Sequence, residues 1–209
     1  MALIYDILSY VNKNIIRRNF WHEKTKLITL STIYPAPCQQ SGKDGFDKIL
    51  SLLTMRVPGI SKIESKTTEE GRVLLKFQDG SFEDPFLARY VSDGTIKMLA
   101  YLTLLYDPAP HPLLCVEEPE NQLYPKLLWE LAEEFRAYAN RGGQVFVSTH
   151  SPDFLNAARL DEVFWLVKKD GYTQVRRAKD DEQLAAYMAE GDQMGYLWEQ
   201  GFFEGADPQ

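Results

Sequence analysis

The sequence predicts an α/β fold built around a mostly parallel sheet, and three observations support this prediction. Two short, largely apolar runs, 113–116 and 144–148, have the composition of strands that are covered on both faces. A segment with helical periodicity, which begins at Pro125, separates these two runs. Helix and strand signals then alternate along residues 93–180, which is the order of elements that a parallel sheet requires.

The region that precedes this alternation differs in character. Residues 1 to about 58 combine helical patterns with an irregular stretch, 32–43, that is rich in Pro, Gln and Gly. Residues 59 to about 92 are predicted to be rich in β structure, because 71–77 has a strand composition and Asp79-Gly80 is a strong hairpin turn signal. We therefore expect a small β-hairpin region before the α/β part.

Proline and glycine mark the ends of the elements in the α/β part. Pro108 ends a first helix, Pro125 takes the first position of a second helix, and Gly142-Gly143 stops that helix. Lys169-Asp170-Gly171 predicts the turn of an antiparallel hairpin at the edge of the sheet. In order, we expect a helix at 95–106, buried strands at 113–116, 144–148 and 162–167, a strand at 173–177 and a mostly helical tail at 181–198.

Composition restricts the class of protein. The chain has 209 residues, of which 44% are hydrophobic and 25% are charged, and its formal net charge is −7. These are values of a globular domain, and the acidic balance argues against non-specific coating of nucleic acid. No apolar run approaches the ~20 residues of a membrane-spanning helix. The start of the chain does not resemble a secretory signal, and Cys38 and Cys115 form no disulfide framework, so we expect a cytoplasmic protein without membrane contact.

Polar residues follow both apolar strands at the point where each strand is predicted to end. Glu117 and Glu118 follow the first strand, and His150 follows the second. Ligands of open parallel sheets bind beyond the carboxyl ends of the strands, so carboxylates and an imidazole would meet there if the strands are neighbours. A third segment, 90–95, opens a helix whose exposed N–H groups and dipole can bind phosphate.

These segments resemble the motifs of ABC-type ATPases, in the same order and with similar spacing. Residues 91–95 resemble the signature motif, 113–120 the Walker B strand with its catalytic glutamate, 121–125 the D-loop, and 147–152 the switch histidine motif. The most similar branch is a soluble branch of predicted AAA-family ATPases that is related to the recombination-repair and chromosome-maintenance ATPases. The ATPase part of the overcoming-lysogenization-defect nucleases is a further relative. The resemblance implies a partial P-loop NTPase core with a helical signature subdomain.

The resemblance also implies a role for each matched residue. Glu118 would orient and polarise the attacking water, and His150 would contact the γ-phosphate. Glu117 would support Mg²⁺, at a position where the wider superfamily usually has Asp. On an extended strand these two glutamates point to opposite sides, so one would face the metal ion and the other the water. The implied nucleotide-binding residues are Ser92, Asp93, Gly94 and Asn121.

A P-loop, Gly-x-x-x-x-Gly-Lys-Ser/Thr, is not recognisable in the sequence. In the Gly-Lys pair at 42–43, the partner glycine is replaced by Pro37 and the hydroxyl residue by Asp44. Proline lacks an N–H group that the phosphate nest needs, and Asp44 would repel phosphates. The chain therefore resembles the C-terminal part of such an ATPase, and we expect weak or no ATPase activity from the isolated chain.

The leading hypothesis is a module for ATP binding and hydrolysis that uses ATP and Mg²⁺. It would dimerise with a P-loop-bearing half or second subunit, and the resemblance implies a DNA-related or defence process in which the assembly contacts DNA. The alternative is a non-catalytic interaction module derived from such an ATPase. We place a domain boundary after residue 92, so that 1–92 forms a helical and β-hairpin subdomain. Residues 93–209 would hold the signature helix, the Walker B and switch-histidine half of the core, and the helical tail.

Overall fold

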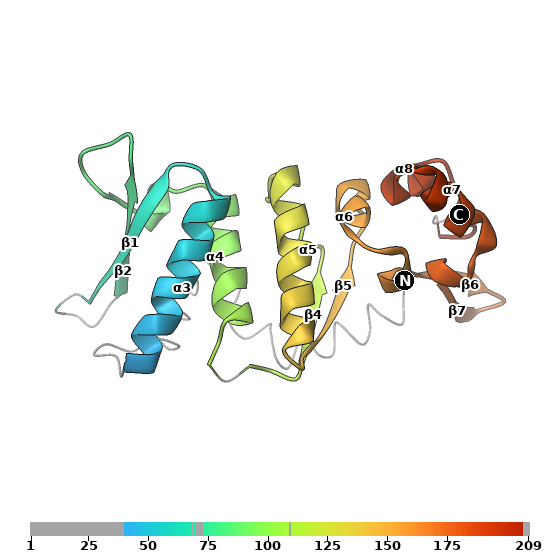
Figure 1. Cartoon of the computed structure of the whole chain (residues 1–209), viewed down its shortest axis with the longest axis horizontal. Helices are drawn as coiled ribbons and strands as arrows, with labels where there is room; N and C mark the ends of the chain where they lie inside the picture. The colour runs from blue at the N-terminus through green and yellow to red at the C-terminus, as the bar shows by residue number, and fades with distance from the viewer. Residues whose placement is uncertain (1–39, 68, 70–72, 109, 207–209) are drawn as a thin grey trace. The chain divides into compact units, whose positions relative to one another are not determined.

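The computed structural model describes residues 40–67, 69, 73–108 and 110–206 (Figure 1). These residues form two compact units. The first unit contains the described residues up to 114 together with 134–144, and the second contains 115–133 and the described residues from 145 onward. The domain boundary that we place after residue 92 stays a prediction. Within the described ranges, no helix has the length and apolar character that crossing a membrane would require.

Helices α3 (Gln40–Arg56) and α4 (Asp93–Leu105) pack against each other in the first unit (Figure 1). The packed face of α4 carries buried residues at helical spacing, among them Met98, Leu102 and Leu105, and Leu53 of α3 is also fully buried. The predicted helix at 95–106 is confirmed, with a start at Asp93. It starts there because the Ser92 hydroxyl caps the helix by accepting a hydrogen bond from the Thr95 N–H at 3.2 Å.

The predicted β-rich region forms an antiparallel sheet of β1 (Ile60–Thr67), β2 (Val73–Asp79) and β3 (Phe86–Leu87), in that order, followed by the 3-10 helix η2 (Ala88–Tyr90). Phe77 of β2 is fully buried. Asp79-Gly80 does not form a two-residue hairpin, because residues 80–85 link β2 to β3. The Asp79 side chain instead accepts a hydrogen bond from the Ser81 N–H at 2.8 Å, which turns the chain locally.

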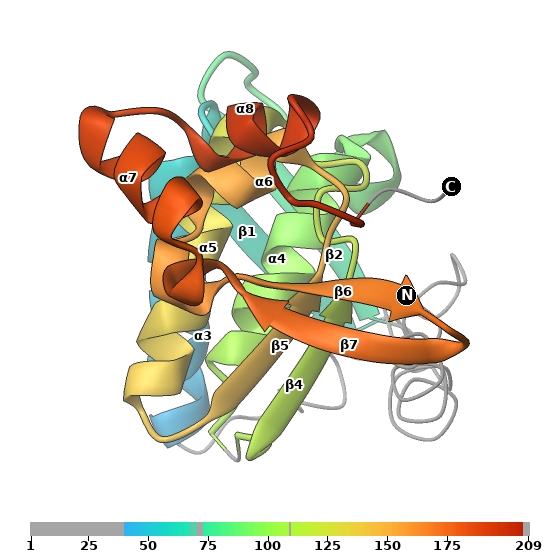
Figure 2. The same cartoon turned by 90° about the vertical axis from the view of Figure 1, so that its right-hand side faces the viewer.

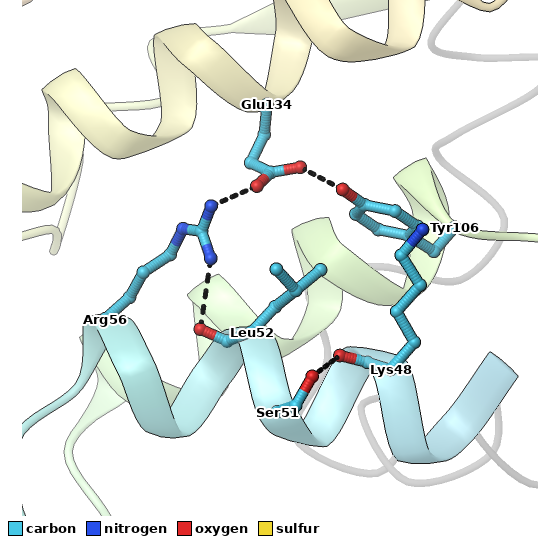
Figure 3. Close-up of polar contacts among 6 residues, drawn as sticks. All are labelled: Lys48, Ser51, Leu52, Arg56, Tyr106 and Glu134. Atoms are coloured by element: carbon cyan, nitrogen blue, oxygen red, sulfur yellow. Dashed lines mark hydrogen bonds and ion pairs between the residues drawn. The ribbon is translucent and has the colours of Figure 1, made fainter. Parts of the chain in front are cut away.

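A buried ion pair joins α3, the end of α4, and α5 (Pro125–Asn140) in the first unit (Figure 3). Glu134 of α5 is only 3% exposed, and its carboxylate accepts hydrogen bonds from Arg56 Nη2 and from the Tyr106 hydroxyl, the latter at 2.7 Å. Burial raises the pKa of Tyr106, and the hydrogen bond to Glu134 raises it further. This cluster of Arg56, Tyr106 and Glu134 is called the Glu134 cluster below.

Strands β4 (Leu113–Glu117) and β5 (Gln144–Ser148) lie side by side, and α5 connects them (Figure 2). At one end, the Gln144 N–H donates to the Pro112 carbonyl at 2.9 Å; at the other end, the Glu118 N–H donates to the Ser148 carbonyl at 2.8 Å. The start of β4 thus lies beside the start of β5, and the end of β4 lies beside the end of β5, so the two strands are parallel. The predicted strands at 113–116 and 144–148 and the helix that begins at Pro125 are thereby confirmed. The expectation that the second strand is buried is wrong, because none of the β5 residues is buried and Phe146 is 60% exposed.

The structure describes one of the two cysteines. Cys115 of β4 is a free, half-buried thiol, and burial raises its pKa. Cys38 lies outside the described residues.

In the second unit, a helical and hairpin region surrounds a compact core. The core residues are Val163, Trp165, Ala178, Leu184, Met194, Leu197 and Phe203. The elements are α6 (Pro152–Ala157), η3 (Leu160–Glu162), β6 (Phe164–Lys169), β7 (Tyr172–Arg177), η4 (Ala178–Asp180), α7 (Glu182–Glu190) and α8 (Met194–Glu199). The predicted helical tail at 181–198 is confirmed as α7 and α8.

The third strand does not extend the parallel sheet. Residues 162–167 were expected to form a buried strand of that sheet, whereas β6 begins at Phe164 and, among the described residues, pairs with β7 in a separate antiparallel sheet (Figure 2). Asp170 and Gly171 have φ values of 50° and 82°, and a two-residue turn with both values positive directs the chain straight back along β6. The predicted antiparallel hairpin is therefore confirmed, and the assignment of its first strand to the parallel sheet is wrong.

The packing of α8 against α6 depends on Gly195. The Gly195 N–H donates to Asn156 Oδ1 at 2.7 Å, and a Cβ at this position would lie 2.2 Å from the Pro152 carbonyl oxygen. Real Cβ atoms essentially never come closer than 3.0 Å to such an atom. The carbonyl belongs to the backbone, so relief requires that one helix shifts away from the other.

We therefore expect Gly195→Ala to reduce the free energy of unfolding by about 1–3 kcal/mol, as overpacking typically does. Urea titration followed by tryptophan fluorescence would measure the loss. Gly80→Ala is the matched control, because a Cβ at Gly80 meets nothing within 4 Å. Equal effects of the two substitutions would contradict the close approach of α6 and α8.

Candidate functional site

The loops that follow β4 and β5 are joined at the carboxyl ends of these strands. The Glu118 N–H donates to the Ser148 carbonyl at 2.8 Å. Two residues later, Glu120 Oε1 accepts hydrogen bonds from the Thr149 hydroxyl at 2.7 Å and from the His150 N–H at 3.1 Å. Glu118 and His150 therefore lie on adjacent loops at one edge of the β4–β5 pair, within the second unit.

The backbone at Glu118 departs from what the strand pattern predicts. β4 ends at Glu117, and Glu118 has φ 43°, in the left-handed region that non-glycine residues rarely adopt. Glu118 therefore does not lie on an extended strand, which was the basis for expecting Glu117 and Glu118 to point to opposite sides. Such a conformation costs about 1–3 kcal/mol and persists where the surrounding structure imposes it, often at functional sites.

Asn121 holds both the backbone and the side chain of Glu118. Its N–H donates to the Glu118 carbonyl at 3.2 Å and closes the turn, and its side-chain Nδ2 donates to Glu118 Oε2 at 2.8 Å. The Glu118 side chain is half-buried. One carboxylate oxygen is thus oriented by an amide donor, which limits the directions in which the carboxylate can act.

Glu117, the residue expected to support Mg²⁺, is the exposed last residue of β4. Among the residues that the structure describes, no group of three or more His, Cys, Asp or Glu could hold a metal ion. Mg²⁺ in nucleotide sites is usually bound through one or two carboxylates together with phosphates and waters. An exposed carboxylate at the end of the strand fits an ion that arrives with a nucleotide, and it does not form a metal site by itself.

The signature-like segment begins α4 in the first unit. Ser92 and Asp93 are exposed, Asp93 is the first residue of the helix, and Gly94 follows in its first turn. The Ser92 hydroxyl is already used locally, since it accepts from the Thr95 N–H and lies 2.8 Å from the Thr95 hydroxyl. The segment therefore has the geometry of a capped helix start, at which N–H groups and the dipole favour anions.

The Gly-Lys pair of the rejected P-loop match lies in a helix. Residues 42 and 43 are part of α3, whereas a P-loop lies between a strand and a helix. Pro37, which replaces the partner glycine, lies outside the described residues.

Sequence reasoning assigned no role to Glu120 and did not predict the contact of Asn121 with Glu118. Both residues reach their hydrogen-bond partners because the chain turns at Glu118, and hydrophobic periodicity does not predict that turn. The signal that the sequence offered for Glu120 was its place as a third carboxylate, two residues beyond Glu118. The sequence did not indicate which way the Glu120 side chain points.

Solved structures of chromosome-maintenance ATPase heads have a similar fold. One structure, described as "Structural biochemistry of ATP-driven dimerization and DNA stimulated activation of SMC ATPases", aligns with a TM-score of 0.53 and 15% identity, over 79% of this chain and 95% of that chain. The SmcHead bound to the C-winged helix domain of ScpA gives a TM-score of 0.51 and 15% identity, and the alignment covers 71% of this chain and 48% of that chain. The third structure is the Smc head domain from Pyrococcus furiosus, with an extended coiled coil and bound to the C-terminal domain of ScpA. It gives a TM-score of 0.50 and 13% identity, and the alignment covers 90% of this chain and 52% of that chain. The chain spans about half the length of these last two chains.

The fold and the order of its elements define an ABC-type, AAA-like ATPase region. The model of the family described as "AAA domain, putative AbiEii toxin, Type IV TA system" matches residues 34–156, which is more than half of the chain, and the chain belongs to this family. The matched range includes the signature-like segment, the Glu118 turn and the loop of His150. A search of curated proteins gave no match.

Proposed function

We propose that this chain supplies the hydrolytic half of a composite ATP site. The observation that carries the proposal is the hydrogen-bonded junction between the Glu118 turn and the His150 loop at the carboxyl edge of β4 and β5. Phosphoryl transfer needs a positioned water and neutralisation of charge on the γ-phosphate, and it needs little covalent chemistry from the protein. A carboxylate and an imidazole on adjacent loops suit these two tasks.

In this proposal the Glu118 carboxylate, held by Asn121, orients and polarises the attacking water. His150, whose side chain is exposed, contacts the γ-phosphate. Glu117 would hold Mg²⁺, which would supply positive charge to the phosphates when bound. Ser92, Asp93 and Gly94 present the start of α4 to the γ-phosphate of a nucleotide that another ATPase half holds.

The triphosphate itself needs a P-loop, and we propose that a P-loop-bearing half or second subunit provides it in a dimer. The titles of the similar structures describe ATP-driven dimerization and DNA-stimulated activation for SMC ATPases, and binding of ScpA for Smc heads. By analogy, ATP binding would close the assembly here and couple it to a DNA-related or defence process. The family description, which includes a toxin–antitoxin system, is consistent with a role in defence. A cytoplasmic location stays a prediction.

Nucleotide binding by the chain alone and by the completed assembly tests this function. The completed assembly is defined here as the full chain together with the P-loop-bearing subunit that co-purifies with it. We expect a fluorescent ATP analogue with Mg²⁺ to bind the chain alone weakly, without turnover above background, and to bind the completed assembly with turnover. Turnover by the contaminant-free chain that Glu118→Gln abolishes would refute the need for a P-loop partner. An assembly that forms without binding nucleotide would instead favour a non-catalytic interaction module.

A further inference from the structure

The Glu120 carboxylate connects the two loops of the candidate site. Glu120 follows β4, and its Oε1 accepts two hydrogen bonds from the loop after β5, namely from the Thr149 hydroxyl at 2.7 Å and from the His150 N–H at 3.1 Å. Both donors converge on one oxygen atom. This contact lies two residues from Glu118, whose own N–H donates to the Ser148 carbonyl. The two loops are therefore bonded on both sides of Pro119.

The second oxygen of this carboxylate lowers the stability of the folded chain. Glu120 Oε2 is buried and has no hydrogen-bond partner in the described part of the chain. Buried polar atoms are nearly always hydrogen-bonded, because an unsatisfied one loses its bonds to water without replacement. A side chain chosen for stability alone would avoid this penalty. The carboxylate is therefore better explained by what its other oxygen holds.

Glu120 begins a short series of hydrogen bonds along the His150 loop. The Thr149 hydroxyl, which donates to Glu120, also accepts from the Ser151 N–H at 3.0 Å. The Ser151 hydroxyl in turn accepts from the Phe154 N–H at 3.3 Å and caps α6. The backbone is thus held immediately before, at and immediately after His150. The imidazole itself is exposed, and this backbone sets the point from which it extends.

We propose that Glu120 is a positioning residue for His150. Its carboxylate holds the His150 backbone beside the Glu118 turn, so that the imidazole extends from a fixed point relative to that turn. The inference rests on the proposed function in that the γ-phosphate contact is assigned to His150. The hydrogen bond from the His150 N–H to Glu120 can be tested without any nucleotide.

The first test measures the His150 amide directly. The chain has 3 histidines, so selective ¹⁵N-histidine labelling gives few signals, and His150→Gln identifies the one that belongs to His150. We expect Glu120→Ala to speed hydrogen exchange of the His150 amide about tenfold or more, which corresponds to the loss of a hydrogen bond to a charged group. Glu120→Gln, which keeps an oxygen acceptor but loses the charge, should have a smaller effect. The other two histidine amides should not change.

Two further variants keep this test decisive. Glu199→Ala removes an exposed carboxylate at the end of α8 and should leave the His150 amide unchanged. Thr149→Val removes the other donor to Glu120 and provides a second measurement if Glu120→Ala does not fold; it should also speed exchange of the His150 amide. A folded Glu120→Ala variant with unaltered exchange at His150 would overturn the proposal.

The second test separates the positioning role from the proposed function. In the completed assembly, Glu120→Ala should lower kcat by up to about 100-fold with little change in KM, as misplacement of a reacting group does. The double variant with His150→Ala should lose no more than His150→Ala alone, because Glu120 acts through His150. Additive losses would contradict the positioning role. An altered His150 amide in a chain whose assembly never hydrolyses ATP would leave the contact established and refute the proposed function.

Discussion

Glu118→Gln should lower the rate of ATP hydrolysis by the completed assembly about 10²- to 10⁴-fold, the range that a lost general base typically costs. Glutamine keeps the length of the side chain and an oxygen that can accept the hydrogen bond from Asn121 Nδ2. It removes the negative charge that polarises the attacking water. Phosphate release under saturating MgATP would measure the loss.

Binding of ATP should survive this substitution, because the amide introduces no bulk and removes a charge that repels phosphates. Glu199→Gln is the control, since it makes the same chemical change at an exposed position at the end of α8. Undiminished turnover in Glu118→Gln, with the assembly intact, would remove Glu118 from the reaction.

Glu134→Ala should lower the free energy of unfolding by about 3–5 kcal/mol, the cost of removing one partner from a buried ion pair. Only 4% of the Glu134 side chain and 13% of the Arg56 side chain are exposed. Without the carboxylate, the Arg56 guanidinium keeps its bond to the Leu52 carbonyl at 3.2 Å but loses the ion pair with Glu134, and the Tyr106 hydroxyl loses its hydrogen bond to Glu134 (Figure 3). Urea denaturation would measure the change.

Two comparisons show whether the buried charge is responsible. Lys126→Ala, at an exposed position on the same helix, should change stability by no more than about 0.5 kcal/mol. The double variant Glu134→Leu with Arg56→Met should recover most of the loss, because apolar side chains of similar volume often replace buried ion pairs without cost. A double variant as unstable as Glu134→Ala would show that the packing of α5, and not the charge, was lost.

The pH dependence of the Glu134 cluster has a definite sign. The raised pKa of Tyr106 means that the folded chain favours the neutral hydroxyl more than the unfolded chain does. This contribution to stability is complete below the ordinary tyrosine pKa of about 10 and is lost as the pH rises through the folded value. Ionisation of Tyr106 should therefore lower the free energy of unfolding at alkaline pH and leave it unchanged in the neutral range.

Some features of this protein follow from local physical chemistry and were predictable from the sequence. Short apolar runs indicate the strands β4 and β5, and Pro125 and Gly142 bound α5 between them, because proline and glycine limit where a helix can run. The further expectation that both strands are covered on both faces does not hold for β5. The Asp170-Gly171 turn is likewise local, since its positive φ values depend on residue type. The placement of Glu118 and His150 at one edge follows from parallel pairing alone.

The candidate site beyond these residues depends on contacts that periodicity does not encode. Glu120 and Asn121 acquire their partners because the chain turns at Glu118, where φ is 43°, and not because of their spacing. In the same way, the helical pattern that begins at Pro125 does not single out Glu134, yet Glu134 is buried against Arg56, 78 positions earlier in the chain.

The sequence by itself thus determined the order of strands and helices, because local apolar patterns and turn residues decide it. The polar residues gather at one edge because β4 and β5 are also neighbours and parallel, which the structure shows. Tertiary structure alone decided that β6 leaves the parallel sheet for β7, which carboxylate holds the His150 loop, and where the buried charges of the first unit meet. The last two are set by hydrogen bonds and an ion pair between segments far apart along the chain, whose free energies exist only once the segments have packed together. The first is set by the pairing of β6 with β7 across the Asp170-Gly171 turn.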